Sequence, residues 1–167
     1  VFIVLIVEGI GDYRLSLTSI AYANIFFSLL LYISEKTSQQ KYSNSDMTAK
    51  HAIIIGLFQT LSLISGASRS GTAITGSLFL GFRKSEAAKY SLMLSIPTIL
   101  GALIFSILEF KTLEEDVSIL TTFIPFLTTF MVSYLSISIF LGLVKKVGYI
   151  PFIVYRLVLG IILLWLI

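Results

Sequence analysis

The sequence predicts an all-α polytopic membrane protein, with transmembrane helices and one re-entrant helix–loop–helix. Hydrophobic residues make up 56% of the 167 positions, and the mean hydropathy is +0.96. Only 13% of the residues are charged, against about 25% in a soluble domain. A surface so poor in charge excludes an ordinary soluble globular domain, a disordered chain and a nucleic-acid-binding module. The chain has no Cys and one His, which excludes a disulfide framework and a Cys- or His-rich metal site.

The apolar stretches follow one another along the chain between clusters of charge. Residues 1–7 are apolar but too few to cross ~30 Å of hydrocarbon. They lack the basic region of a signal peptide, so we interpret them as the end of a helix whose start lies upstream. The longer stretches are predicted to be spanning helices, because a helix satisfies all its backbone groups within lipid. These stretches are Leu15–Ile33, Ala87–Phe110, Val117–Val144 and Ile150–Ile167.

The loop charges predict which side of the membrane each stretch faces. Segments 34–50, 83–84 and 145–146 are net basic, and basic loops stay cytoplasmic. Segments 8–14 and 111–116 are net acidic and are expected outside. Consecutive stretches then alternate in direction, as spanning helices must, with one exception.

The exception is His51–Phe82, which begins and ends on the cytoplasmic side. It is too short for two full crossings of about 20 residues each. We therefore predict a re-entrant helix–loop–helix over about 51–82. Non-helical backbone at membrane depth is tolerated only where it is buried in protein or lines a water-filled cavity.

The turn of this segment is predicted at Ser65–Thr72, a small and polar stretch with two glycines. Ser70 or Thr72 is expected to cap the following half-helix. A helix N-terminus, hydroxyls and the Arg69 guanidinium together favour an anion site, above all for phosphate. Two alternatives stay open: the small residues pack between helices, and Arg69 snorkels or pairs with a carboxylate. Arg156, in the last apolar stretch, is either a second buried cation or an interfacial anchor.

The turn also carries a family resemblance. Ser65–Gly71 resembles the second signature of the bacterial undecaprenyl-diphosphatase family of the bacitracin-resistance type, Pro-Gly-x-Ser-Arg-Ser-Gly. Four surrounding stretches also resemble the family: Asp46–Thr48, Gly56–Gln59, Ser95–Thr98 and Ile150–Arg156. The resemblance spans essentially the whole chain.

The resemblance implies a fold and an activity. Residues 1–167 would form a single integral membrane domain, half of an inverted-repeat architecture whose N-terminal repeat is missing. Members of the family hydrolyse undecaprenyl diphosphate to the monophosphate and inorganic phosphate. That reaction recycles the lipid carrier of peptidoglycan synthesis and confers resistance to bacitracin. The implied location is the bacterial inner membrane, with the site toward the periplasmic side.

The resemblance also assigns roles to individual residues and names partners. Ser68, Arg69 and Ser70 would be catalytic, with Arg69 holding the diphosphate. The implied partners are a polyprenyl diphosphate, membrane lipids and a second copy in a homodimer, but no nucleic acid. The substrate-binding residues would be Gly66, Gly71, Thr72, Thr75 and Gln59.

This sequence departs from the family pattern in three places. The first family signature, with paired Glu, a Ser-Ser-Thr-Gly stretch and a His, is absent. The family implies a divalent cation, Mg²⁺ or Ca²⁺, whose ligands we do not find in this sequence, so the fragment alone is expected to be inactive. Ser65 replaces the usual Pro. Thr72 precedes Ala73 where the family has the reverse order.

Two other classes of function remain as alternatives. A transporter or flippase half also has broken helices that meet at midplane, and a helix terminus with an Arg can bind a transported anion. A lipid- or phosphate-binding scaffold without chemistry is the third class. Paired Glu residues upstream of this sequence would favour the enzyme.

Overall fold

The computed structural model describes residues 16–110 and 119–167. The predicted helix end at 1–7 and the acidic segments at 8–14 and 111–116 lie outside the described residues. Within those two ranges the regular elements are all helical, which confirms the predicted all-α class. They are α3 (Leu17–Thr37), η1 (Asn44–Asp46), α4 (Ala49–Thr60), η2 (Leu61–Leu63), α5 (Arg69–Phe79), α6 (Lys84–Phe110), α7 (Ile119–Val147) and α8 (Ile150–Trp165).

Three helices in the described part of the chain are long and apolar enough to cross a membrane. They cover Leu17–Thr37, Lys84–Ile107 and Phe123–Val147, and each overlaps a stretch predicted to span. α8 is apolar but has 16 residues, fewer than the ~20 that a full crossing needs, so its crossing stays a prediction. The composition and these three helices place the chain among membrane proteins.

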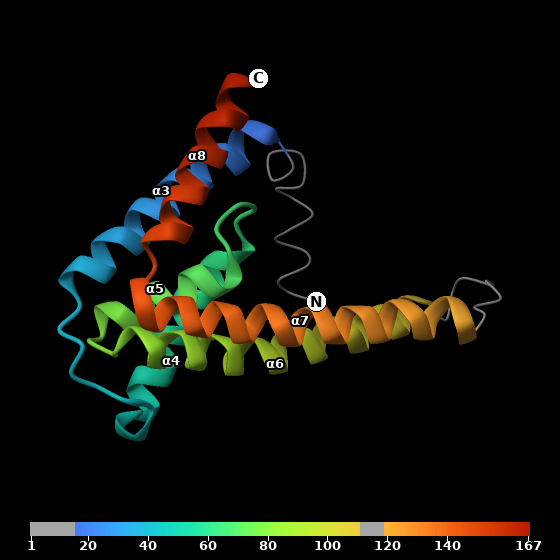
Figure 1. Cartoon of the computed structure of the whole chain (residues 1–167), viewed down its shortest axis with the longest axis horizontal. Helices are drawn as coiled ribbons and strands as arrows, with labels where there is room; N and C mark the ends of the chain where they lie inside the picture. Colours follow the sequence, from blue (N-terminus) through green and yellow to red (C-terminus); the bar gives the residue numbers. More distant parts are fainter. Residues whose placement is uncertain (1–15, 111–118) are drawn as a thin grey trace.

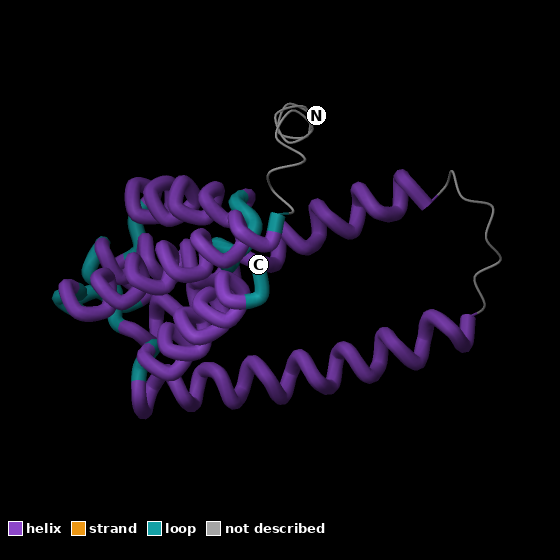
Figure 2. The backbone as a smooth tube through the Cα atoms, turned by 90° about the horizontal axis from the view of Figure 1, so that it is seen from above, coloured by secondary structure: helices purple, strands orange, loops and turns teal. Residues whose placement is uncertain are grey.

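The helices form two pairs around α4 and α5. α3 and α8 lie side by side, and α5 packs against α3, α4 and α6 (Figure 1). α6 and α7 extend away from this group, and their ends near residues 110 and 119 stand apart (Figure 2). Large apolar side chains along both, such as Phe105 and Phe130, are exposed, as expected where a helix contacts lipid chains or another apolar helix.

The segment predicted as helix–loop–helix has that form. α4 ends in the short turn η2, the chain reverses at residues 64–68, and α5 returns. The two ends of the segment lie together, because the ring centroids of His51 and Phe82 are 5.3 Å apart. Tyr42, upstream of the segment, is also bound there: its N donates to Gly81 O (3.0 Å), and its O accepts from Arg83 N (2.9 Å). The segment therefore begins and ends at one place, and its entry and exit on one side of a membrane stay a prediction.

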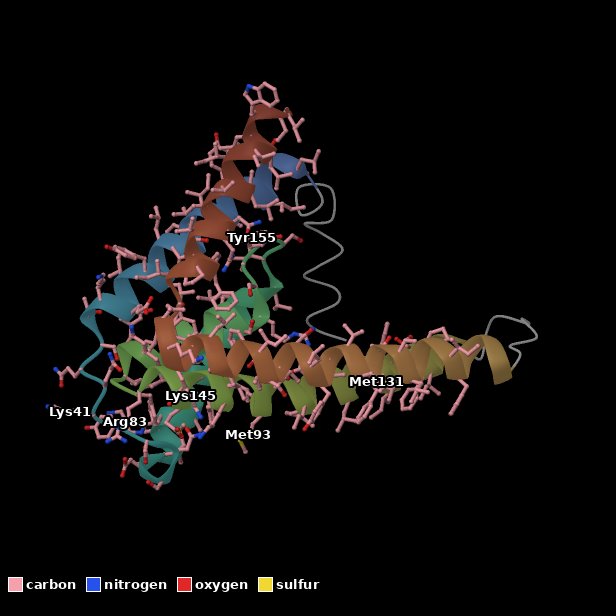
Figure 3. The ribbon with its side chains drawn as sticks, in the orientation of Figure 1. Lys41, Arg83, Met93, Met131, Lys145 and Tyr155 are labelled. Carbon is pink, nitrogen blue, oxygen red and sulfur yellow. The ribbon has the colours of Figure 1, made fainter. Side chains whose placement is uncertain are left out.

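The basic segments that the topology places on one side also lie together. Gln40, Arg83, Lys84 and Lys145 line one hollow of about 290 Å³. Lys41, Arg83 and Lys145 are all at the end of the molecule away from the tip of the 64–68 turn (Figure 3). The basic segments thus share one end of the molecule, and the side of the membrane that this end faces stays a prediction.

A buried ion pair joins α3, α6 and the start of α8 at this end. The Glu35 carboxylate is 5% exposed, lies 2.6 Å from Lys84 Nζ and accepts from Tyr149 N at 3.0 Å. Tyr149 Oη in turn donates to Lys84 O at 2.8 Å. Burial, and then the Glu35 charge, raise the pKa of Tyr149, so its hydroxyl stays a donor. This network fixes the packing that holds α8 against α3.

Replacing Lys84 by Met should destabilise the protein strongly. The substitution leaves the Glu35 carboxylate buried without its cation, a change that costs about 3 kcal/mol or more. The measurement is the unfolding temperature of the protein in detergent. Lys89→Met is the matched control, because it breaks the exposed pair with Glu86 (3.0 Å) and should cost less than about 1 kcal/mol. Equal losses for the two variants would contradict the prediction.

Candidate functional site

Ser68 is the N-cap of α5, and its backbone conformation is strained. Its Oγ accepts from Gly71 N at 3.2 Å, and its backbone has a φ of 69°. A non-glycine residue in that region costs about 1–3 kcal/mol and is found preferentially at functional sites. The prediction that Ser70 or Thr72 caps this helix was wrong. The turn ends earlier than expected, so both residues lie inside the first turn of α5.

The residues of the predicted anion site gather at this start of α5. The side chains of Ser68, Arg69 and Ser70 are all exposed, and Ser68 Oγ lies 3.5 Å from Ser70 Oγ. Among the described residues Arg69 forms no ion pair with a carboxylate. The turn thus presents two hydroxyls, a guanidinium and a helix N-terminus to its surroundings, which is a donor set that suits phosphate oxygens.

Gly66 and Gly71 make room for this arrangement. Gly66 has a φ of +92°, and a Cβ there would lie 2.6 Å from the Ile20 carbonyl oxygen of α3. Gly71 has ordinary helical backbone, but a Cβ would lie 3.0 Å from Arg156 Nη1 and 3.2 Å from Ser68 Oγ. Gly66 lets the turn approach α3 closely, and Gly71 leaves a space at the first turn of α5.

Arg156 of α8 is buried beneath the turn, which settles the choice that its sequence position left open. It is 9% exposed. Nη2 donates to Gly66 O (2.7 Å) and to Ala67 O (3.1 Å), and Nε donates to Asn24 Oδ1 of α3 (3.1 Å). One guanidinium therefore ties α8 and α3 to the turn. The sequence offered one signal for it, a lone charge in an apolar stretch, and none for Asn24.

A pocket of about 200 Å³ opens beside this cluster. Its polar side consists of Ser68, Ser70, Gly71 and Arg156, and Tyr155 beside it lies near the turn (Figure 3). The remaining walls are mostly apolar. They come from Leu31, Ile74, Phe140, Tyr149 and Phe152. A pocket polar at one end and apolar along its walls matches an amphiphile with an anionic head.

Arg69, predicted to be catalytic, does not line this pocket, and neither do the predicted substrate-binding residues Gly66, Thr72, Thr75 and Gln59. The hydroxyls of Thr72 and Thr75 are buried and donate within α5, to Arg69 O (3.0 Å) and Gly71 O (2.8 Å). Gln59, on α4, donates to Thr98 Oγ1 of α6 at 2.9 Å. In this chain these side chains support the helices around the turn, and their contact with a substrate stays a prediction.

The described residues do not fit a divalent cation. No group of three or more His, Asp or Glu side chains among them could hold a metal ion, and the residues that line the pocket include no carboxylate. We therefore assign no metal ligand and derive no step through a metal.

Comparison with known proteins connects this chain to a family. A family model described as "Bacitracin resistance protein BacA" matches residues 1–162. The chain is similar to an "Undecaprenyl-diphosphatase" of Alteromonas mediterranea, at 40% identity over 146 residues, 87% of this chain and 55% of the relative. A protein of the same name from Chromohalobacter salexigens is 40% identical over 145 residues, 87% of this chain and 55% of the relative.

A third relative gives the same result. The "Undecaprenyl-diphosphatase" of Campylobacter curvus is 37% identical over 159 residues, 94% of this chain and 59% of the relative. The chain thus spans less than two thirds of the length of these relatives. The matched residues contain the turn, α5 and Arg156, the elements that build the pocket. The chain belongs to the bacitracin resistance protein BacA family.

Proposed function

We propose that the full-length protein hydrolyses undecaprenyl diphosphate to undecaprenyl phosphate and inorganic phosphate. The observation that carries the proposal is the pocket, which combines hydroxyls, a helix N-terminus and a guanidinium with apolar walls. The names of the relatives agree with this reaction. The proposed setting is the inner membrane of a bacterium, with the site toward the periplasm, where the reaction would recycle the lipid carrier and confer resistance to bacitracin.

The proposed roles follow from the geometry of the first turn of α5. The diphosphate head lies at the N-terminus of α5, where Arg69 neutralises charge on the phosphoryl oxygens. The hydroxyls of Ser68 and Ser70 contact these oxygens. Water positioned by these hydroxyls attacks the terminal phosphorus, the bond from phosphorus to the bridging oxygen breaks, and undecaprenyl phosphate leaves. Alternatively a serine hydroxyl attacks first and loses its proton, undecaprenyl phosphate leaves, and water then hydrolyses the phosphoserine. Net addition of water yields the monophosphate and inorganic phosphate.

The test is phosphate release by the full-length protein in detergent. We expect one phosphate per undecaprenyl diphosphate and none from undecaprenyl monophosphate under the same conditions. Detergent removes the second compartment that transport needs, so hydrolysis there favours the enzyme over a transporter or flippase. Absence of release from a folded protein, with substrate and Mg²⁺ or Ca²⁺ supplied, would reject the proposal. Size-exclusion chromatography with light scattering on the same sample tests the expected homodimer.

A further inference from the structure

One donor of the Arg156 guanidinium is buried without a partner. Nε and Nη2 make three hydrogen bonds to protein oxygens, but Nη1 has none among the described residues and is shielded from solvent. Those three acceptors are an amide oxygen and two carbonyls, and none of them carries a negative charge. A buried charged donor left unpaired is costly, and such a group in a native protein requires an explanation.

Nη1 points to the start of α5. A Cβ built on Gly71 would lie 3.0 Å from Nη1 of Arg156 and 3.2 Å from Ser68 Oγ. The missing side chain of Gly71 thus leaves a space bordered by the guanidinium, the Ser68 hydroxyl and the first turn of an 11-residue helix. Arg156, Gly71 and Ser68 all line the same pocket. The N–H groups of a first helical turn attract anions to such a space.

We propose that Arg156 is a second phosphate-binding residue of this site. Its Nη1 donates to the phosphoryl group that binds at the first turn of α5. This inference rests on the proposed function for the identity of the substrate. The two arginines differ in their surroundings, because Arg156 is buried and makes three hydrogen bonds, whereas Arg69 is exposed. The Arg156 guanidinium lines the pocket, whereas Arg69, the first residue of α5, does not line it but supplies a second cation next to Ser68 and Ser70 in the chain. Two cations match the two phosphoryl groups of a diphosphate, and the apolar walls of the pocket suit a lipid chain, so the ligand class is an isoprenyl diphosphate.

The same geometry couples the ligand to the turn. The guanidinium that contacts the phosphate also binds Gly66 O and Ala67 O, so an anion on Nη1 fixes the orientation of the group that holds the turn. Arg156→Lys retains the charge, but an ammonium cannot occupy all of these positions at once. The substitution therefore removes either the contact with the turn or the contact with the anion.

Two variants test the proposal in the full-length protein, with a farnesyl methylenediphosphonate as a probe that cannot be hydrolysed. Isothermal titration in detergent measures its Kd. Arg156→Lys should raise the Kd of the probe at least tenfold, which is the effect of losing one charge-assisted hydrogen bond. It should also lower the unfolding temperature. Gly71→Ala should weaken binding of the probe at least tenfold with little change in that temperature, because alanine favours a helix and its Cβ occupies the space beside Nη1 and Ser68 Oγ.

The control is Gly101→Ala on α6, where a Cβ would meet nothing within 4 Å, and its Kd should equal that of the unmodified protein. Binding of the probe by both site variants within twofold of the unmodified protein would overturn the inference, whether or not the protein hydrolyses its substrate. If the protein binds the probe through Arg156 and releases no phosphate, the proposed function fails and the phosphate contact stands. Gly71→Ala keeps the test decisive should Arg156→Lys fail to fold.

Discussion

Replacing Arg69 by Ala is expected to lower kcat/KM for undecaprenyl diphosphate more than a hundredfold. Phosphoryl transfer depends mainly on charge neutralisation and positioning, and loss of one such transition-state contact costs about 3 kcal/mol. The unfolding temperature should change little, because the side chain is exposed and forms no ion pair among the described residues. The measurement is phosphate release by the full-length variant in detergent.

The control for this variant is Arg83→Ala. Arg83 is also exposed, but it follows the end of α5 and lines the basic hollow, whereas Arg69 is at the start of that helix. The control loses the same charge and should retain kcat/KM within about twofold, since surface substitutions away from a site have small effects. An Arg69→Ala protein with unmodified kcat/KM would remove Arg69 from the site.

Replacing Gly66 by Ala should disrupt the turn itself. The backbone at a φ of +92° is strained for any residue with a Cβ, and that Cβ would lie 2.6 Å from the Ile20 carbonyl oxygen. Strain and overlap together should cost more than about 2 kcal/mol of unfolding free energy. Activity should fall as well, by roughly a hundredfold, because a displacement of about 1 Å in a positioning group has an effect of that size.

Gly142→Ala is the matched control for the turn. A Cβ at this position in α7 would meet nothing within 4 Å, so the variant should be as stable as the unmodified protein or slightly more stable. Unfolding temperature and kcat/KM are measured on both variants. A Gly66→Ala protein that matches Gly142→Ala in both would show that the close approach of the turn to α3 is unnecessary.

The positions of the helices could be predicted because charge is scarce in this sequence. Each cluster of charges ends an apolar stretch, so the predicted stretches Leu15–Ile33 and Ala87–Phe110 match α3 and α6 closely. The helix–loop–helix followed from the same charges, since a segment that begins and ends at basic clusters must turn back. The hydropathy of a stretch depends only on residues that are neighbours in the sequence, so the local sequence is sufficient to predict where these helices lie.

The details of the site could not be predicted in the same way. The cap was misplaced because a positive φ is unusual for serine, so the sequence gives no signal that the helix begins after Ser68. Arg156 could not be assigned because its partners Asn24 and Gly66 lie 132 and 90 positions away in the chain. Hydrogen bonds over such separations depend on how α3 and α8 pack, and the motif around Arg69 contains no information about that packing.

The hydrogen bonds from Arg156 to the turn also affect when the site can form during synthesis of the protein. The ribosome completes the Ser65–Thr72 turn long before it reaches Arg156, and until then nothing from α8 holds the carbonyls of Gly66 and Ala67. A nascent chain that has inserted the whole motif therefore still lacks the shaped turn. Its maturation waits for α8 to insert beside α3, so the site is assembled only after α8 has been made.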